Sequence, residues 1–274
     1  MTRPPVGRDA KPRFPAGLGQ APSPAHGANA AVLRPQLHLQ QAAQDATRQH
    51  APSGIGLDSS AFRLRMVERL RAGGVGCEPV LQAFLAIERH RFVDTALATQ
   101  AYEDTSLPIG FQQTISKPSV VAHMLALLFD GEYARGAGEL GRVLEIGTGC
   151  GYQTALLARL ARQVISIERL KSLHDKARDN LGNPRAGDVR LVFGDGMLGH
   201  SPRAPYQSII SAAGGDDLPL SWLDQLAEGG RLIAPSVDPV RGGQALLVVD
   251  RSAQGLTRRW LDAVRFVPLK SGTQ

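Results

Sequence analysis

The chain has 274 residues, 43% of them hydrophobic and 20% charged, which is ordinary for a folded globular protein. Its net charge is +6, but residues 1–57 carry six Arg or Lys against two Asp, so only +2 remains for residues 58–274. A folded part with nearly balanced, mixed charges argues against a nucleic-acid-binding protein.

Two cysteines, Cys77 and Cys150, are too few for a disulfide framework and indicate free thiols in a reducing compartment. No stretch has the roughly 18 apolar residues of a membrane span, and residues 1–30 lack the apolar block of a secretory signal. Neither Cys nor His occurs at metal-ligand spacing. We therefore expect a cytoplasmic protein, a monomer, with no metal, membrane or nucleic-acid partner.

Residues 1–57 hold eight of the 18 prolines and show little hydrophobic periodicity. Such a segment buries too little apolar surface to offset the entropy of ordering, so we expect a mostly disordered tail, with partner docking as the alternative. A single domain is predicted over 58–274. Its first part, 58–130, is a helical cap with an active-site loop, and its second part, 131–274, is a cofactor-binding sheet.

The cap begins with a helix that Asp58 or Ser59 can cap and that ends at Gly73-Gly74, followed by a second helix after Pro79. Residues 102–117 then form a polar segment with Pro and Gly, long enough to suggest a functional loop without regular structure. A helix is predicted from Pro118 to Phe129, and Ser116 could be its N-cap or a functional group.

From Val143 onward, apolar β-branched runs alternate with helical segments. This alternation predicts a doubly wound α/β sheet that is mostly parallel and antiparallel at its end. The predicted strands are 143–146, 163–167, 189–193, 206–211, 231–234, 244–249 and 256–266, and the predicted helices between them are 153–161, 171–181 and 218–227.

The turn after the first strand carries glycines at alternate positions, Gly147, Gly149 and Gly151, around Thr148. This spacing differs from the G-x-G-x-x-G of dinucleotide sites, and no Lys-Ser/Thr pair follows to hold a triphosphate. Glu145, just before the turn, would repel phosphates but suits the positive sulfonium and amino groups of S-adenosyl-L-methionine. The turn therefore predicts that cofactor.

Two further acids follow the next strands, Glu168 and Asp195, the latter before Gly196. Carboxyl ends of parallel strands meet at one edge of a sheet, where ligands bind. Glu168 is placed to accept the ribose hydroxyls and Asp195 to accept the adenine amine. Each acid alone could be a solvated carboxylate at a strand end; together they indicate a class I, Rossmann-like, S-adenosylmethionine-dependent methyltransferase.

Five motifs make the resemblance to one family specific. In chain order they are Leu107-Pro108-Ile109-Gly110 with Gln113-Thr114-Ile115-Ser116, Val143-Leu144-Glu145-Ile146-Gly147-Thr148-Gly149-Cys150-Gly151-Tyr152-Gln153-Thr154, Gly194-Asp195-Gly196, Leu226 with Gly229-Gly230, and Arg265-Phe266-Val267-Pro268-Leu269. From about residue 60 to 270 the chain resembles the protein-L-isoaspartate (D-aspartate) O-methyltransferases. The resemblance implies methyl transfer to the free α-carboxylate of L-isoaspartyl residues in damaged proteins or peptides, which starts repair through a succinimide.

The resemblance also implies residue roles. Ser116 would be the active-site serine that holds the acceptor carboxylate, Thr114 and Ile115 would border the cofactor, and Val267, Pro268 and Leu269 would lie beside the substrate backbone. For Asp104, in the same loop as Ser116, we consider closure over the substrate or simple capping of the loop.

Three departures from the family pattern stand out. Gln112 replaces a usual Gly, Gln207 replaces a usual Asp, and Ser211-Ala212-Ala213-Gly214 replaces Thr-Ala-Ala-Pro. They keep two alternatives open: a class I methyltransferase with another acceptor, and a cofactor-binding homologue without turnover.

Overall fold

The computed structural model describes residues 60–182 and 189–274, all within one compact unit that spans Pro52–Gln274. The predicted tail and the candidate caps Asp58 and Ser59 lie outside the described residues. Within the described part, no helix has the length and apolar character needed to cross a membrane.

The predicted helices of the cap are present. They are α2 (Ser60–Ala72), α3 (Glu78–Ala86) and α4 (Pro118–Phe129), with short 3-10 helices η1 (Arg89–Phe92) and η2 (Thr95–Gln100) between α3 and α4. A further helix, α5 (Glu132–Ala137), was not predicted, because six residues that include Gly136 show no hydrophobic periodicity.

The expectation of an irregular loop over 102–117 is wrong in part. Residues Leu107–Gly110 form β1 and Gln113–Ile115 form β2, paired as an antiparallel hairpin. The two turn residues between them, Phe111 and Gln112, have φ of 52° and 57°. A two-residue hairpin turn of type I′ requires positive φ at both positions, which glycine adopts most readily, so Gln112 occupies a strained position.

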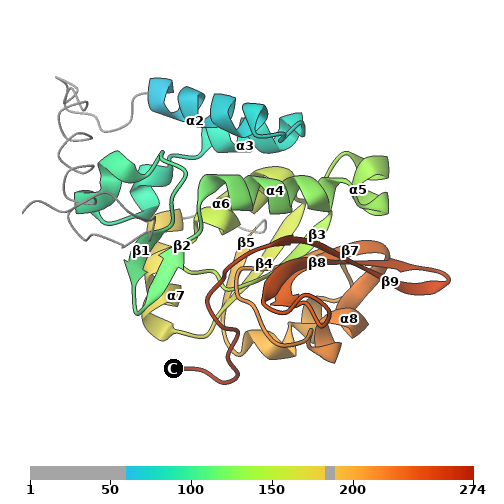
Figure 1. Ribbon diagram of the computed structural model, residues 1–274. Helices are drawn as coiled ribbons and strands as arrows, with labels where there is room; N and C mark the ends of the chain where they lie inside the picture. Colours follow the sequence, from blue (N-terminus) through green and yellow to red (C-terminus); the bar gives the residue numbers. More distant parts are fainter. Residues whose placement is uncertain (1–59, 183–188) are drawn as a thin grey trace, which may run out of the picture. The chain divides into compact units, whose positions relative to one another are not determined.

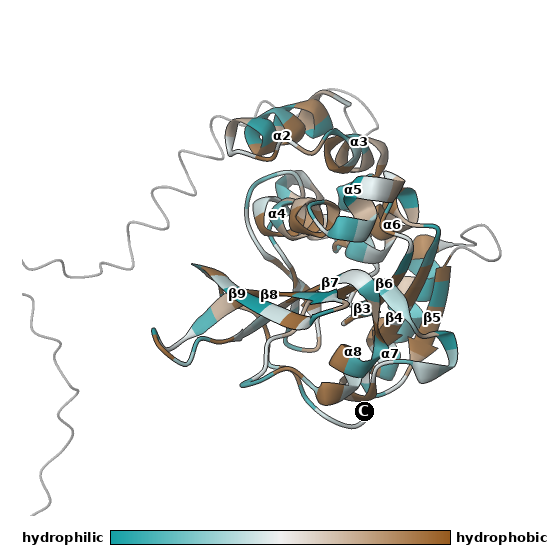
Figure 2. Ribbon diagram, turned by 90° about the vertical axis from the view of Figure 1, so that its right-hand side faces the viewer, coloured by the Kyte–Doolittle hydropathy of each residue, from teal (hydrophilic) through white to brown (hydrophobic). Residues whose placement is uncertain are grey.

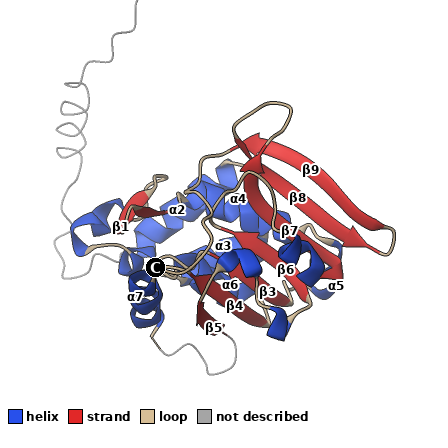
Figure 3. Cartoon of the chain, turned by 90° about the horizontal axis from the view of Figure 1, so that it is seen from below, coloured by secondary structure: helices blue, strands red, loops and turns tan. Residues whose placement is uncertain are grey.

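The main sheet has seven strands in the described residues, in the order β5-β4-β3-β6-β7-β8-β9. Pairing is parallel from β5 to β7 and antiparallel from β7 to β9, as predicted. Figure 3 shows these strands side by side. Their bounds are β3 Arg142–Ile146, β4 Gln163–Glu168, β5 Val189–Phe193, β6 Tyr206–Ser211, β7 Leu226–Val237, β8 Gln244–Ser252 and β9 Gly255–Ala263.

Three helices connect the strands: α6 (Tyr152–Leu160), α7 (Lys171–Leu181) and α8 (Leu220–Gln225), together with the short η3 (Gly196–Leu198) and η4 (Ser201–Arg203). The predicted helix over 218–227 is too long, because β7 already begins at Leu226. Gly229, with a φ of 73°, lies within β7, which is longer than the predicted strand 231–234.

Helices cover both faces of the sheet (Figures 1 and 2). The buried side chains of α2, α3, α4, α6 and α7 share one core cluster with strand residues such as Val143 and Val164. Those of α8 share a second cluster with Leu144, Ile146 and Ile165. Because side chains alternate along a strand, Glu145 belongs to the α6 face, together with Val143.

Candidate active site

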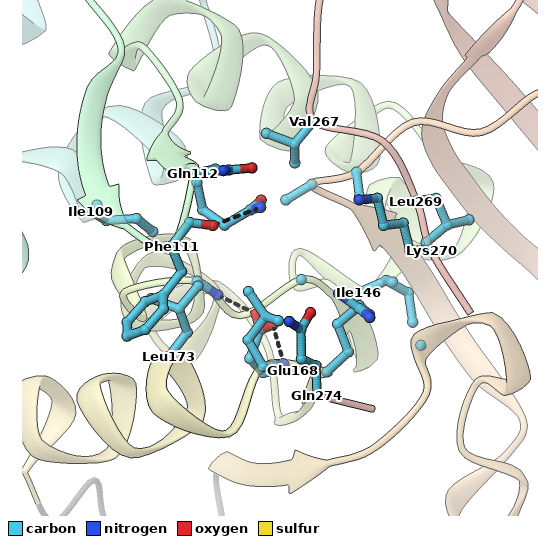
Figure 4. A pocket seen from close by; sticks show the side chains of 18 of the residues that line it. Ile109, Phe111, Gln112, Ile146, Glu168, Leu173, Val267, Leu269, Lys270 and Gln274 are labelled. Carbon is cyan, nitrogen blue, oxygen red and sulfur yellow. Dashed lines mark hydrogen bonds between the residues drawn. The ribbon is translucent and has the colours of Figure 1, made fainter. Parts of the chain in front are cut away.

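A cavity of about 610 Å³ lies at the carboxyl edge of the sheet. Figure 4 shows its walls: the β1–β2 hairpin with Ile109, Phe111 and Gln112, the segment from Val267 to Lys270, and Glu168 with Gln274. The ends of β3 and β4 and the start of α7 complete it. This is where a doubly wound sheet binds ligands, so we call it the cofactor cavity.

Only part of the glycine turn reaches the cofactor cavity. Gly147 and Gly149 line it, with φ of 88° and 58°, so the backbone faces the cavity without side chains. Gly151 and Thr148 are not among its lining residues. Gly151 packs against α7, where an added Cβ would lie 3.1 Å from Leu181 Cγ, and the buried Thr148 hydroxyl is 2.6 Å from Ser166 Oγ. Of the four turn residues predicted to contact the cofactor, Gly147 and Gly149 therefore line the cavity, whereas Thr148 and Gly151 make contacts inside the protein.

Glu168 lines the cofactor cavity at the end of β4 and is 5% exposed. Its carboxylate accepts one hydrogen bond from Gly149 N and one from Leu170 N, both 2.9 Å. Each oxygen retains capacity for a second donor. The carboxylate is thus held in one orientation, available to a pair of ligand hydroxyls.

Glu145 does not reach the cofactor cavity, contrary to the prediction. It is 0% exposed on the α6 face, where it accepts from Gln153 Nε2 at 3.0 Å and from Thr154 Oγ1 at 2.5 Å. Burial raises the pKa of Glu145 to about 7, against the lowering effect of its hydrogen bonds from Thr154, Ser166 and Gln153. The acid anchors α6 beneath the glycine turn, because strand alternation turns its side chain away from the ligand edge.

The carboxylate of Asp195 is hydrogen-bonded to other residues of the protein. It accepts from Met197 N at 2.9 Å, from Ser271 Oγ at 2.8 Å and from Gly272 N at 2.6 Å. Partial burial raises the pKa of Asp195, but the hydrogen bonds from Gly272, Ser271 and Met197 outweigh it and lower the pKa overall. Asp195 is not among the cavity's lining residues, whereas Gly196 is.

The segment 270–274 forms a wall that no motif had indicated. Arg169 Nε donates to Gly272 O at 3.0 Å, Gln274 N donates to Arg169 O at 2.8 Å, and Lys171 N donates to Gln274 O at 2.8 Å. Lys270 and Gln274 line the cofactor cavity (Figure 4). Asp195 and Arg169 therefore hold this segment beside the cavity.

A second cavity, of about 410 Å³, adjoins the first. The two share Thr114, Ala212 and Val267 as lining residues. Ser116 lines the second cavity and is absent from the first. We call the second space the acceptor cavity. Its lining residues are Ser106, Thr114, Ser116, Lys117, Val120, Ala212, Ala263, Val264, Arg265, Phe266 and Val267.

Ser116 is not the N-cap of α4. The cap position is Lys117, with no side-chain cap bond. Asp104 instead closes this helix start by accepting from Ser119 N and Ser119 Oγ, both at 2.8 Å. Asp104 therefore fits the alternative of a loop cap and does not line the acceptor cavity, while the Ser116 hydroxyl makes no hydrogen bond to the described residues.

Three predicted neighbours of the ligands are placed differently. Ile115 points into the core and is 6% exposed, because β2 alternates between core and cavity and Thr114 takes the cavity side. Pro268 and Leu269 line the cofactor cavity, where we expected substrate contacts, and only Val267 reaches both cavities.

Two of the three departures have a clear local use. Gln207 Oε1 accepts from Arg142 N at 2.8 Å and so fastens the start of β3, away from both cavities. Gly214 N donates to Val267 O at 2.9 Å, and Leu269 N donates back to Gly214 O at 2.7 Å. A proline at 214 would lack that donor, so this chain gains a bond that holds the Val267–Leu269 segment.

The cofactor cavity fits S-adenosylmethionine. Its volume lies in the range of small-molecule sites. Gly196 lines the cavity and packs against Ile146, where an added Cβ would come within 2.7 Å of Ile146 Cγ2. Glu168 offers acceptors for two hydroxyls, and the shared lining residues Thr114, Ala212 and Val267 carry no positive charge to oppose a sulfonium.

Comparisons with known proteins agree with this site. The model of the family described as Protein-L-isoaspartate(D-aspartate) O-methyltransferase (PCMT) matches residues 62–274. A protein-L-isoaspartate O-methyltransferase of Methylibium petroleiphilum is 57% identical over 269 residues, which cover 98% of this chain and 99% of that one. One of Leptothrix cholodnii is 58% identical over 241 residues, 88% and 84% of the two chains.

A solved structure named protein-L-isoaspartate O-methyltransferase is similar with a TM-score of 0.67 and 28% identity, covering 76% of this chain and 66% of that chain. The class I fold predicted from the strand and helix alternation is thereby confirmed. The chain belongs to the protein-L-isoaspartate (D-aspartate) O-methyltransferase family, a family of enzymes that use S-adenosylmethionine as the methyl donor.

Proposed function

We propose that this enzyme transfers a methyl group from S-adenosylmethionine to the free α-carboxylate of L-isoaspartyl residues in damaged proteins or peptides. The ester then closes to a succinimide, whose hydrolysis returns part of the residue to normal aspartate. The observation that carries the proposal is the make-up of the acceptor cavity. Among the described residues that line it, there is a serine hydroxyl with no intramolecular partner and no Asp, Glu, His or Cys.

That composition favours a carboxylate acceptor over an alcohol or an amine. A carboxylic acid with a pKa near 4 is already ionised at neutral pH and needs no general base. An alcohol or ammonium acceptor must first lose a proton, which requires a base within hydrogen-bond reach. With no Asp, Glu, His or Cys among the described residues that line the cavity, the remaining task is to align the acceptor oxygen with the methyl group.

Ser116 would perform that alignment. Its hydroxyl would donate to one oxygen of the acceptor carboxylate and leave the other oxygen facing the boundary between the two cavities. Thr114, Ala212 and Val267 form this boundary. When bound, the cofactor supplies a methyl group activated by a positively charged sulfur. Lys117 and Arg265 line the same cavity and would attract a negatively charged acceptor.

We also propose the cofactor contacts. Gly147, Gly149 and Gly196 would let the ligand approach the backbone, Glu168 would accept the ribose hydroxyls, and Thr114 would border the methyl end. Glu145 and Asp195 would act indirectly, by holding α6 and segment 270–274.

The test is incubation with labelled S-adenosylmethionine and a matched pair of peptides that contain isoaspartate or aspartate at one position. Base-labile methyl ester on the isoaspartyl peptide alone is the expected result. Label on both peptides, or a base-stable product on another acceptor, would point to a different methyltransferase. Cofactor binding by calorimetry without transfer to any acceptor would point to a homologue without turnover.

We also propose a monomeric enzyme as the working unit. Cys77 and Cys150 are free thiols, in keeping with a reducing, cytoplasmic location. The nearly balanced charge of residues 58–274 supports damaged proteins, and not nucleic acids, as partners.

A further inference from the structure

Arg89 is a buried cation outside both cavities. It is the first residue of η1 and is 0% exposed. Within the described residues, no carboxylate lies within salt-bridge distance of its guanidinium. An arginine buried without an acid is costly, and an apolar residue of similar volume is often more stable at such a position. A reason other than packing is therefore needed for a charge here.

The contacts of the guanidinium join three separate segments. Its Nε donates to Ala101 O at 2.8 Å, just after η2, and its Nη2 donates to Ser116 O at 2.8 Å. Its Cζ lies over the ring of Tyr152, 4.8 Å from the ring centroid, in a cation–π contact. Burial raises the pKa of Tyr152 to about 12, so this ring is a neutral phenol at neutral pH.

Ser116 lies where β2 has ended and α4 has not begun, so no regular backbone bond holds its carbonyl. On one side, Ile115 pairs with Leu107 in the hairpin. On the other side, Asp104 caps the start of α4 through Ser119. The bond from Arg89 fixes the peptide between these two anchors, and with it the direction in which the Ser116 side chain leaves the backbone.

We propose that Arg89 is a positioning residue, which holds the Ser116 peptide so that the serine hydroxyl faces the acceptor cavity. Tyr152, the first residue of α6 after the glycine turn, supports the guanidinium from the cofactor side. Arg89 thus links the peptide of Ser116 to Tyr152 of α6, the helix that follows the glycine turn. This proposal rests on the proposed role of Ser116 and extends it.

The test is a double-mutant cycle with Arg89→Lys and Ser116→Ala, assayed on the isoaspartyl peptide. Lysine keeps the positive charge but cannot reach two carbonyls in the fork geometry of arginine. Loss of the charge-assisted bond to Ser116 O should lower kcat roughly 10- to 100-fold in Arg89→Lys. In the Ser116→Ala background, Arg89→Lys should lower kcat by less than about twofold, because the hydroxyl to be oriented is gone.

Two measurements separate positioning from general damage. Cofactor affinity, measured by calorimetry, should stay within about twofold of wild type in Arg89→Lys, since the three glycines and Glu168 are untouched. The matched control is Phe84→Leu. Phe84 is fully buried and packs edge-on against the same Tyr152 ring, with centroids 6.1 Å apart, so it should lower the melting temperature but leave kcat close to wild type.

An equal fall in kcat for Arg89→Lys in both backgrounds would overturn the proposal. A fall in kcat in Phe84→Leu that accompanies its lower melting temperature would overturn it as well. If Arg89→Lys fails to fold, Tyr152→Leu provides the same cycle, because it removes the support of the guanidinium and leaves Arg89 itself in place. Failure of the proposed function looks different: the wild-type enzyme would then transfer no methyl group to the isoaspartyl peptide at all.

Discussion

The two cavities are built in opposite ways. The cofactor cavity rests on strand ends and a glycine turn, and its lining carboxylate, Glu168, is already hydrogen-bonded to two backbone amides. Asp195, outside the lining, is hydrogen-bonded to segment 270–274. The acceptor cavity is lined by segments 106–120 and 263–267 and by Ala212, and the Ser116 hydroxyl in its lining makes no hydrogen bond within residues 60–182 and 189–274.

This contrast separates binding from turnover. A group whose hydrogen bonds also hold the backbone cannot be removed without loosening the site, so changes in the cofactor cavity should appear as lost affinity. A free group in the acceptor cavity can be removed with little effect on its neighbours, so changes there should appear as lost turnover. Five variants test this separation and the groups that hold the two cavities in place, from the largest expected effect to the smallest.

Glu168→Ala should weaken cofactor binding most. It removes an acceptor of two ligand hydroxyls, at roughly 1.5–3 kcal/mol each, so the Kd measured by calorimetry should rise at least about 100-fold. Gly149 and Leu170 also lose their acceptor. Glu168→Gln keeps one acceptor oxygen, so its cofactor affinity should fall less than that of Glu168→Ala. An unchanged Kd in the alanine variant would refute the ribose assignment.

Glu145→Gln should change the pH dependence of stability. The pKa of Glu145 is raised to about 7 in the folded state, so between about pH 4.3 and 7 the folded protein binds more protons than the unfolded chain. The wild type therefore loses stability from this group as the pH rises through that window, and the glutamine variant does not.

Relative to wild type, the free energy of unfolding of Glu145→Gln should increase by up to about 3 kcal/mol between pH 4.5 and pH 8, where the shift of the pKa is converted at 1.36 kcal/mol per unit. Urea denaturation at both pH values measures it. Parallel pH profiles for the two proteins would show that the carboxylate is ionised without cost, and the account of Glu145 as a buried anchor would fail.

Ser116→Ala should lower kcat on the isoaspartyl peptide by roughly 10- to 30-fold, because one hydrogen bond to a charged acceptor is lost. Cofactor affinity should be unchanged. Ser119→Ala is the matched control: it removes the hydroxyl that Asp104 binds and should reduce stability but not rate. If both variants lose rate and stability alike, the helix start and not the hydroxyl is the important feature.

Removal of residues 270–274 should weaken cofactor binding by roughly 3- to 10-fold, as expected for the loss of weak contacts from one wall. Ser271→Ala, which removes only one bond to Asp195, should have a smaller effect in the same direction. Tighter binding after removal would mean that this segment obstructs the cavity, and the adenine role first assigned to Asp195 would become the better explanation.

Gln112→Gly should stabilise the protein by about 0.5–1 kcal/mol, since relief of left-handed strain exceeds the added entropy of the unfolded chain. Turnover should stay within about twofold of wild type. Gln113→Gly, in the adjacent strand, should destabilise because it has no such strain to relieve. A loss of rate in Gln112→Gly alone would show that this side chain takes part in the site.

Much of this enzyme follows from local sequence. The bounds of α4, α7, β5 and β6 agree with the predictions, because apolar periodicity and glycine or proline punctuation depend only on neighbouring residues. The strand–glycine turn–helix unit from Arg142 predicted the cofactor cavity in the same way. The hairpin β1–β2 was missed because its turn uses Phe111 and Gln112 in place of the usual glycine and asparagine.

The sequence by itself determined the fold class, the family and the residues at the ligand edge, since these depend on motifs that are contiguous in the chain. Only the tertiary structure decided which of these residues reach the ligand. Strand alternation directs the side chains of Glu145 and Ile115 into the core. Asp104 caps the start of α4, the role first considered for Ser116, and segment 270–274 is hydrogen-bonded to Asp195. The physical reason is that a side chain's direction and its free hydrogen-bonding capacity depend on partners tens of residues away.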